Sequence, residues 1–326
     1  MTATIGRLRQ IGIGKETTPG TGVAASYWIG CESGDVAADV DYTEDSSNSG
    51  RIEAPNASIV TREDATINVT AVARSDWLGH VLKGALGASA SDVASGESAV
   101  WEHIFTVSNT AAHTSHSLVL KDGVVTERSV YAMLNSMTLS CEANGLLMCD
   151  MEWLGRALAD TTATPAYASD HIWKGSQCNV KLATDLSGLA AASAVKFNRV
   201  ALTIEKGLVR HPTLGSITMD RGINTALRIT GELDLLYEAA TYRDFFTDGS
   251  NRAMRIAFDG DAIGVAEFAS LQIDLAKCHF TEYSRDGGND DPIIQKLGFV
   301  AHFDMDEGTP QMITATLTNE ETTTVY

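Results

Sequence analysis

Residues 137–151 of this 326-residue chain read MTLSCEANGLLMCDM, and they decide its fold class. Apolar and polar side chains alternate on both sides of the dipeptide Asn144-Gly145. A two-residue period is typical of strands with one buried face, and Asn-Gly between two such runs is a strong hairpin signal. The stretch therefore predicts two antiparallel strands joined by a tight turn.

The same alternation recurs on both sides of this hairpin. Residues 65–71 (ATINVTA) and residues 271–275 (LQIDL) both place apolar side chains at every second position. Hydrophobic residues make up 44% of the chain, which is enough to build a core. We therefore expect a mainly β protein.

Helical patterns are few and short. In residues 75–87, Ser75 or Asp76 could cap a helix, Gly87 could end it, and the apolar side chains between them share one face. Residues 241–249 form a second candidate with an aromatic face. We interpret both apolar faces as core packing rather than as ligand sites.

The two predicted helices suggest an internal duplication. Each follows a strand of similar pattern, residues 67–71 in one case and residues 227–231 in the other, at an offset of 160 residues. A pair of strands follows each helix in turn. Both halves therefore show the order long loop, strand, helix, strands, which indicates a repeated unit.

The duplication predicts two tandem domains. We expect a first β domain over residues 1–160, a linker region rich in Ala and Thr over residues 161–194, and a second β domain over residues 195–326. Short strands within the linker region are expected near Trp173 and residues 180–182.

Two polar stretches precede the repeated strands. Residues 32–58 are acidic and carry few large apolar side chains, and residues 205–222 occupy the corresponding place in the second half. We interpret both as long loops without internal structure, which in compact domains are often functional.

The charge balance limits the possible partners. The chain has 42 acidic and 24 basic residues, with a formal net charge of −18. This argues against binding the outside of a nucleic acid, which needs a cation-rich surface, but not against enclosing one in a repulsive channel. No apolar run is long enough for a membrane span, and residues 1–7 lack the apolar core of a signal peptide, so we expect no membrane and folding in a cytoplasm.

No pattern of catalytic residues emerges. In residues 12–17 Glu16 stands where a phosphate loop needs Ser or Thr, and His113 and His116 have no further ligand near them. The five cysteines are scattered, and we interpret them as reduced thiols. The sequence thus predicts no enzyme, no cofactor and no metal.

Several segments, in order along nearly the whole chain, resemble the major tail tube proteins of tailed bacteriophages. The start at residues 14–21 (GKETTPGT) is similar to the G-x-E-x-x-x-G-T start of many members. Further similarity lies in residues 77–87, 103–105, 115–120, 135–140 and 314–319.

This resemblance implies two tandem tail-tube-like β-sandwich or barrel domains, each with one short flanking helix. It also implies stacked rings that form the tube for genome delivery in a long, non-contractile tail. Such rings typically carry six domains, so a duplicated chain implies a homotrimer with a pseudo-hexameric ring. A hexamer with an added domain is the alternative. Implied partners are further copies of the chain, the tape measure protein, tail-tip and terminator proteins, and phage DNA that passes without specific binding. The resemblance places the protein in the virion tail, assembled in the host bacterial cytoplasm.

The long loops are then expected to stack one ring on the next. The candidate residues for ring stacking are charged side chains of the two stretches: Asp39, Asp41, Glu44, Asp45, Arg51, Arg210 and Arg221. The alternative function is a monomeric β-sandwich that binds a carbohydrate or a protein, which would explain the strands but not the paired loops.

Overall fold

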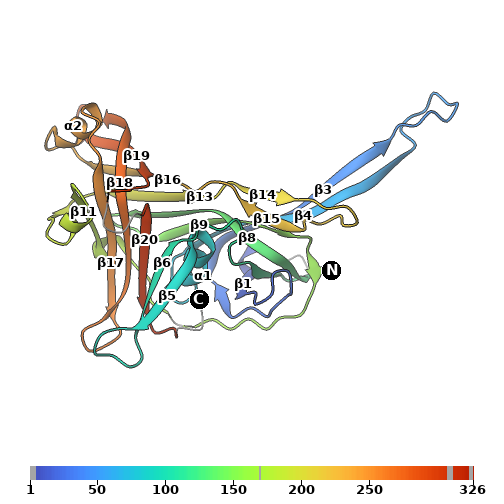
Figure 1. Cartoon of the computed structure of the whole chain (residues 1–326), viewed down its shortest axis with the longest axis horizontal. Coiled ribbons are helices and arrows are strands. Elements are labelled where there is room, and N and C mark those ends of the chain that lie inside the picture. Colours follow the sequence, from blue (N-terminus) through green and yellow to red (C-terminus); the bar gives the residue numbers. More distant parts are fainter. Residues whose placement is uncertain (1–4, 169, 307–310, 323–325) are drawn as a thin grey trace.

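The computed structural model describes residues 5–168, 170–306, 311–322 and 326. The chain is mainly β, as predicted, with strands gathered in a body from which one long hairpin projects (Figure 1). This hairpin, β3–β4, extends well beyond the rest of the molecule.

The first part of the chain, up to residue 160, carries helix α1 (Leu78–Leu86) and a short 3₁₀ turn, η1 (Gly6–Leu8). Its strands are β1 (Gln10–Lys15), β2 (Tyr27–Ile29), β3 (Cys31–Asp45), β4 (Ala57–Val72), β5 (Gly87–Val93), β6 (Trp101–Val107), β7 (His116–Lys121), β8 (Thr126–Glu142), β9 (Met148–Arg156) and β10 (Ala159–Asp160).

The rest of the chain carries helix α2 (Thr241–Thr247) and the 3₁₀ turns η2 (Gly175–Gln177) and η3 (Ser187–Leu189). Its strands are β11 (Cys178–Ala183), β12 (Ala194–Val195), β13 (Arg199–Glu205), β14 (Leu208–His211), β15 (Arg221–Asn224), β16 (Arg228–Leu236), β17 (Arg252–Ala262), β18 (Phe268–Asp286), β19 (Ile294–His302) and β20 (Ile313–Asn319).

Each half contains a four-stranded antiparallel unit of the same order. In the first half β3 pairs with β4, β4 with β9, and β9 with β8. In the second half β13 pairs with β16, β16 with β19, and β19 with β18. The two units are joined edge to edge, because β8 pairs with β13 over seven residue pairs from Arg199–Glu142 to Glu205–Ser136. One sheet therefore runs through both halves.

The two units also share an irregularity. The pairing of β8 with β9 shifts between Leu134 and Ser136, and that of β18 with β19 shifts between Phe280 and Glu282. Each shift is a β-bulge, in which one strand has an extra residue without a partner. A bulge bends its strand, and its position can be used to align the two units. Aligning the two shifts makes Ser136 equivalent to Glu282.

This alignment corrects the sequence-based register of the duplication. Through the ladders it makes Ile67 equivalent to Gly231, an offset of 164 residues (231 − 67), rather than to Leu227 as the alternation suggested. The error is four residues because a period of two fixes which face a side chain occupies but not its position along the strand.

The helices lie where the sequence predicted them. All residues of α1 except Lys83 are buried, and α1 ends at Gly87, whose φ of 92° suits glycine. Neither predicted residue is the N-cap: Trp77 takes that place without a side-chain cap, and Ser75 donates to Asp170. Asp76 accepts a hydrogen bond from the Trp77 backbone at 2.7 Å, just before the helix. In α2 the half-buried Tyr242 and Phe245 pack against the core.

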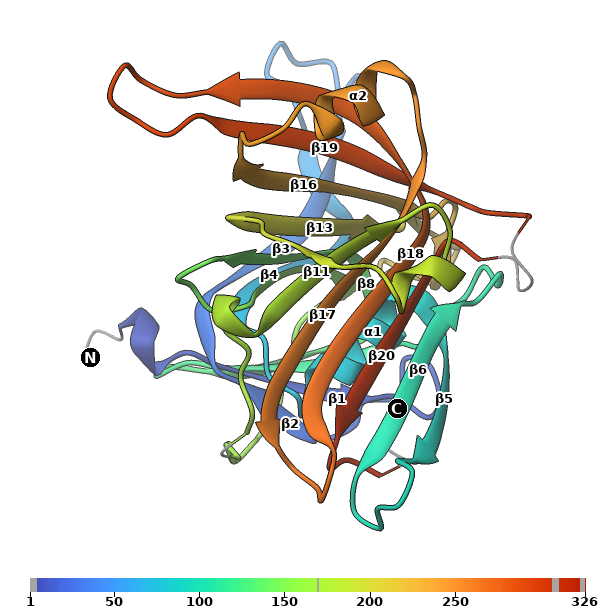
Figure 2. The ribbon, with the colours of Figure 1, turned by 90° about the vertical axis from the view of Figure 1, so that its left-hand side faces the viewer.

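A single large core extends through both halves. It lies between α1 and the inward face of the sheet, and its largest members include Trp77, Trp153 and Phe299. Figure 2 shows β17, β18 and β20 side by side with β6 and β5, which continue the β-structure around this core. The opposite face of the two four-stranded units carries no helix among the described residues.

The two predicted loops are wrong as loops. Residues 32–58 form most of β3, the hairpin tip and the start of β4, paired as far as Asp45–Ala57. Residues 205–222 include β14 and the first half of β15, which pair as a separate short hairpin. Strands are recognised in a sequence by the apolar residues of a buried face, and the distal part of β3–β4 buries neither face.

The expected linker region is ordered where described. As predicted, a strand lies at residues 180–182, within β11, which pairs with β17. Trp173 is fully buried and donates a hydrogen bond from Nε1 to the Ala269 carbonyl oxygen at 2.8 Å. Its backbone also pairs with the first half, through the bridges Arg74–Ile172 and Leu146–Lys174. This region thus packs onto both halves, and the domain boundaries stay a prediction.

The GKETTPGT segment owes its conformation to a buried carboxylate. Glu16 is 5% exposed, and its oxygens accept hydrogen bonds from the backbone of Gly20 and Tyr131 and from the hydroxyls of Ser115 and Ser117, at 2.7–2.9 Å. Four donors to one carboxylate compensate the cost of burying its charge. Glu16 thereby ties the start of the chain to β7 and β8.

Candidate interaction surfaces

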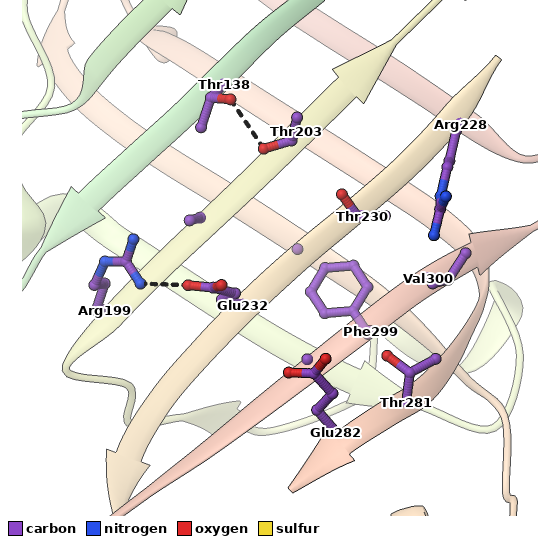
Figure 3. A pocket seen from close by; sticks show the side chains of 13 residues that line it. Thr138, Arg199, Thr203, Arg228, Thr230, Glu232, Thr281, Glu282, Phe299 and Val300 are labelled. Carbon is purple, nitrogen blue, oxygen red and sulfur yellow. Dashed lines mark hydrogen bonds and ion pairs between the residues drawn. The ribbon is translucent and has the colours of Figure 1, made fainter. Parts of the chain in front are cut away.

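The uncovered face of the sheet is polar. Side chains that point away from the core on β8 and β13 include Ser136, Thr138, Ser140 and Thr203, which alternate with buried residues such as Met137, Leu139 and Leu202. The Thr138 and Thr203 hydroxyls share a hydrogen bond of 2.9 Å across the junction of the two units (Figure 3).

A shallow hollow of about 350 Å³ lies on this face, lined from β8, β13, β16, β18 and β19. Arg199 forms an ion pair with Glu232 at 2.8 Å along its floor (Figure 3). Beneath Gly231 lies the ring of Phe299, so close that a β-carbon at residue 231 would clash with it. The ring thus fills the core side of the sheet at Gly231, and the lining of the hollow on the other face shows no arrangement of a nucleophile and a base.

Acidic residues outnumber basic ones on this face. The exposed or half-buried charged side chains on β8, β9, β13 and β16 are Glu127, Glu142, Asp150, Glu152, Glu205, Glu232 and Asp234 against Arg128, Arg156, Arg199 and Arg228. Such a surface repels a polyanion.

The β3–β4 hairpin is the second surface, and we call its part beyond Asp41 and Arg62 the arm. Three of the predicted stacking residues lie on it: Glu44 and Asp45 on β3, and Arg51 in the tip. The arm also exposes large apolar side chains, with Tyr42 at 63%, Ile59 at 60% and Ile52 fully exposed. Apolar side chains held out on a projecting hairpin are typical of a contact surface.

At the root of the arm the structure brings together two predicted residues from the two halves. Arg210 on β14 pairs with Asp39 on β3 at 2.8 Å. Arg210 also donates to the Ala65 carbonyl oxygen at 2.7 Å and to the Thr66 hydroxyl at 2.9 Å. Burial alone would raise the pKa of Asp39, but hydrogen bonds from Thr66 and Arg210 and the positive charges of Arg210 and Arg62 hold this pKa below its ordinary value.

A second group of contacts completes the root. Arg62 pairs with the predicted residue Asp41 at 3.0 Å. The buried carboxylate of Asp64 accepts a hydrogen bond from the Met219 backbone at 2.9 Å, and the Glu63 backbone donates to the Ile217 carbonyl oxygen at 2.8 Å. The segment between β14 and β15 therefore lies against the start of the arm.

The β14–β15 hairpin has a small core of its own. Leu208 and Met219 pack with Tyr131 and Met133 in a cluster separate from the main core. The predicted residue Arg221, on β15, is exposed and pairs with its neighbour Asp220, at 2.8 Å. Asp39, Asp41 and Arg210 are thus brought together, and Glu44, Asp45, Arg51 and Arg221 are not.

The sequence reasoning missed Asp64, Thr66 and Met219. The alternation of residues 65–71 places Asp64 and Thr66 on the polar face, where no burial is expected. They are covered because the β14–β15 hairpin folds over them, a long-range contact that no local pattern signals.

Two strand edges complete the candidate surfaces. Among the described residues, β3 pairs with β4 alone, and no strand pairs with the edge of β18 opposite β19 beyond Cys278. Unpaired edges of this kind are sites where another strand can add.

The titratable groups of the body have structural roles. His116 is fully buried, and burial together with the charges of His80, Lys206 and Lys15 places its pKa well below the ordinary value. Burial raises the pKa of the Cys141 thiol to about 11, and all five cysteines are free. In the described part of the chain, no three His, Cys, Asp or Glu side chains gather as metal ligands.

No helix within the described ranges is long and apolar enough to cross a membrane.

Comparison with known protein families gives a match. A family model described as phage tail tube protein matches residues 6–301, from η1 to the end of β19. No curated protein matches the chain.

Proposed function

We propose that this chain, which belongs to the phage tail tube protein family, assembles with copies of itself into stacked rings that form the channel for genome delivery. Three copies would make one ring, and the six four-stranded units of these copies would surround the channel. The tape measure, tail-tip and terminator proteins of the same phage would be its further partners in the virion tail.

The observation that carries the proposal is the repeated unit. The units β3-β4-β9-β8 and β13-β16-β19-β18 have the same order and the same bulge, and the chain joins them through β8 and β13. A rotation that relates the first unit to the second, applied again, brings the free edge of β18 to the free edge of β3 in a second copy. A head-to-tail contact of this kind closes into a ring when the rotation divides a full turn.

The uncovered face supports a channel wall. The helices cover the other face of the sheet, so closing the ring with the polar face inward would keep the core dry and expose Ser, Thr and acidic side chains to the lumen. An excess of negative charge there would let DNA pass without binding. The arm, which projects from the body, would contact the next ring.

Electron microscopy tests this function directly. Negatively stained protein at high concentration, or mixed with tail-tip complexes of the same phage, should show hollow tubes whose end-on views have six lobes with threefold modulation. True sixfold rings would retain the function and contradict the trimer. Monomers alone under both conditions would contradict the proposal and favour a monomeric binding module.

A further inference from the structure

The pairing of β8 with β13 joins the two units within one chain. In a ring, the same kind of strand pairing would join one copy to the next. The seven pairs of β8 with β13 include Leu202 opposite Leu139 and Thr203 opposite Thr138, and Arg199 lies opposite Glu142. No two like charges face each other in this ladder. The internal joint is therefore electrostatically favourable.

The equivalence of the units fixes the register of the external joint. On one side Ser136 is equivalent to Glu282, because both follow the shared bulge. On the other side, Glu152 and Gly298 are equivalent, and they pair with Asn68 and Glu232, respectively. Asn68 in turn pairs with Asp35, and Glu232 pairs with Ala201. Asp35 is therefore equivalent to Ala201, and Asp39 to Glu205.

From this equivalence we infer that β18 of one copy pairs antiparallel with β3 of the next copy in a register that opposes like charges, so that ring closure is electrostatically restrained. This inference rests on the proposed function and adds a register and a regulation to it. The opposed pairs are Asp286 with Asp35, Ser284 with Ala37, and Glu282 with Asp39.

The two acidic pairs differ in their surroundings. Asp39 is already neutralised by Arg210 of its own chain at 2.8 Å. Asp35 is 86% exposed, and its ion pair with the half-buried Arg9 is long, at 3.9 Å. Exposed ion pairs are weak, so the pair Asp35–Asp286 carries most of the repulsion. Directly opposed like charges destabilise a strand pair, and salt screens them.

A charge-reversal cycle tests the register. Asp35→Lys or Asp286→Lys alone places opposite charges across the joint and should lower the protein concentration needed for assembly about two- to fivefold, as measured by light scattering and sedimentation. The double variant opposes two lysines and should return that concentration towards the wild-type value. Raised salt should promote assembly of the wild type more than that of either single variant.

Glu102→Lys is the matched control. Glu102 is exposed on β6, away from both edges, and its replacement makes the same change in net charge. An equal effect of this control, or additive effects in the double variant, would overturn the inferred register.

Cross-linking gives a second readout that does not depend on charge. Directly opposed residues on paired strands have β-carbons about 4.5–5.5 Å apart, close enough for a disulfide with small adjustment. The variant Ala37→Cys/Ser284→Cys should give covalent dimers and trimers under oxidation, whereas each single variant should not. Tubes without this cross-link would overturn the register and leave the proposed function intact. A failure of every variant to assemble at any salt concentration would overturn both.

Discussion

The arm and the β14–β15 hairpin occupy the same place in the two units, yet they behave differently. Each connects the first strand of its unit to the second, β3 to β4 in one case and β13 to β16 in the other. The arm continues two long strands into solvent, whereas β14–β15 folds over the root of the arm and buries Met219 in a small core. The β14–β15 hairpin buries its apolar side chains against its own chain, whereas the arm leaves its apolar side chains exposed.

This difference teaches that the duplication is unequal in function. Six identical connections around a ring would give six identical contacts, but three copies of this chain would supply three projecting arms and three short hairpins that support them. Nothing in the described part of the chain covers the apolar side chains of the arm, such as Ile52 and Ile59. We therefore expect the arm to find its partner in another copy.

Removing the arm gives the largest expected effect. Residues 42–61 can be replaced by Asn-Gly, because Asp41 pairs with Arg62 and a two-residue turn suits the end of a ladder. The shortened chain keeps Asp39, Asp41 and Arg62, so it should fold normally and form no tubes. Circular dichroism would check folding, and electron microscopy would check assembly.

The matched control for this deletion changes the arm without removing it. Replacing Ser47 and Ser49 by Ala alters small polar side chains of the tip and should leave tube formation intact. Normal tubes from the deletion would show that the arm is not needed for stacking.

Met219→Ala tests what holds the short hairpin in place. Met219 is 2% exposed, and truncating a buried methionine costs about 2–5 kcal/mol, with the low end expected for a small peripheral cluster. Hydrogen exchange of residues 208–224 should become faster, while exchange in the main core stays unchanged. Ile217→Ala, at a position that is 47% exposed, should change neither. Unchanged exchange in Met219→Ala would mean that polar contacts alone hold the hairpin.

Arg210→Ala tests the polar link between the two connections. It removes the ion pair with Asp39 and leaves the Ala65 carbonyl oxygen without this donor, so the free energy of unfolding should fall by about 1–3 kcal/mol. Arg221→Ala, which removes only an exposed pair with Asp220, should change it by less than about 0.5 kcal/mol. Equal losses in the two variants, measured by chemical denaturation, would contradict a specific role of Arg210.

The sequence predicted those elements that bury one face. The alternation of residues 137–151 corresponds to β8 and β9, with a turn in which the Gly145 backbone donates to the Glu142 carbonyl oxygen at 2.9 Å. The two short helices were found because their apolar faces pack against the core.

The arm and its root could not be predicted in the same way. The distal strands of the arm are held by backbone hydrogen bonds to each other, which leave no mark on the order of apolar residues. The contact of Arg210 with Asp39 joins residues far apart in the sequence. Charge alone does not distinguish Arg210, which makes this contact, from the exposed Arg221. Local sequence patterns indicate which residues are buried within a strand or helix. The arm strands and the contact of Arg210 with Asp39 arise from long-range packing, which such patterns do not indicate.

The smallest expected effect is a pH dependence of the stability that the Arg210–Asp39 ion pair contributes at the root of the arm. The pKa of Asp39 lies below 3.8 in the folded protein, so its carboxylate stabilises the fold above the unfolded pKa, and this contribution is lost as the pH falls through the folded pKa. The difference in unfolding free energy between the wild type and Arg210→Ala should therefore stay constant from about pH 7 to pH 5 and narrow below about pH 4. Denaturant titrations of both proteins across this range would measure it. In Asp39→Asn, which has no charge to lose, the cost of Arg210→Ala should be smaller and independent of pH, because only the neutral hydrogen bonds of Arg210 remain. A gap that stays constant down to pH 2 would mean that Arg210 supports the arm through the Ala65 carbonyl oxygen rather than through Asp39.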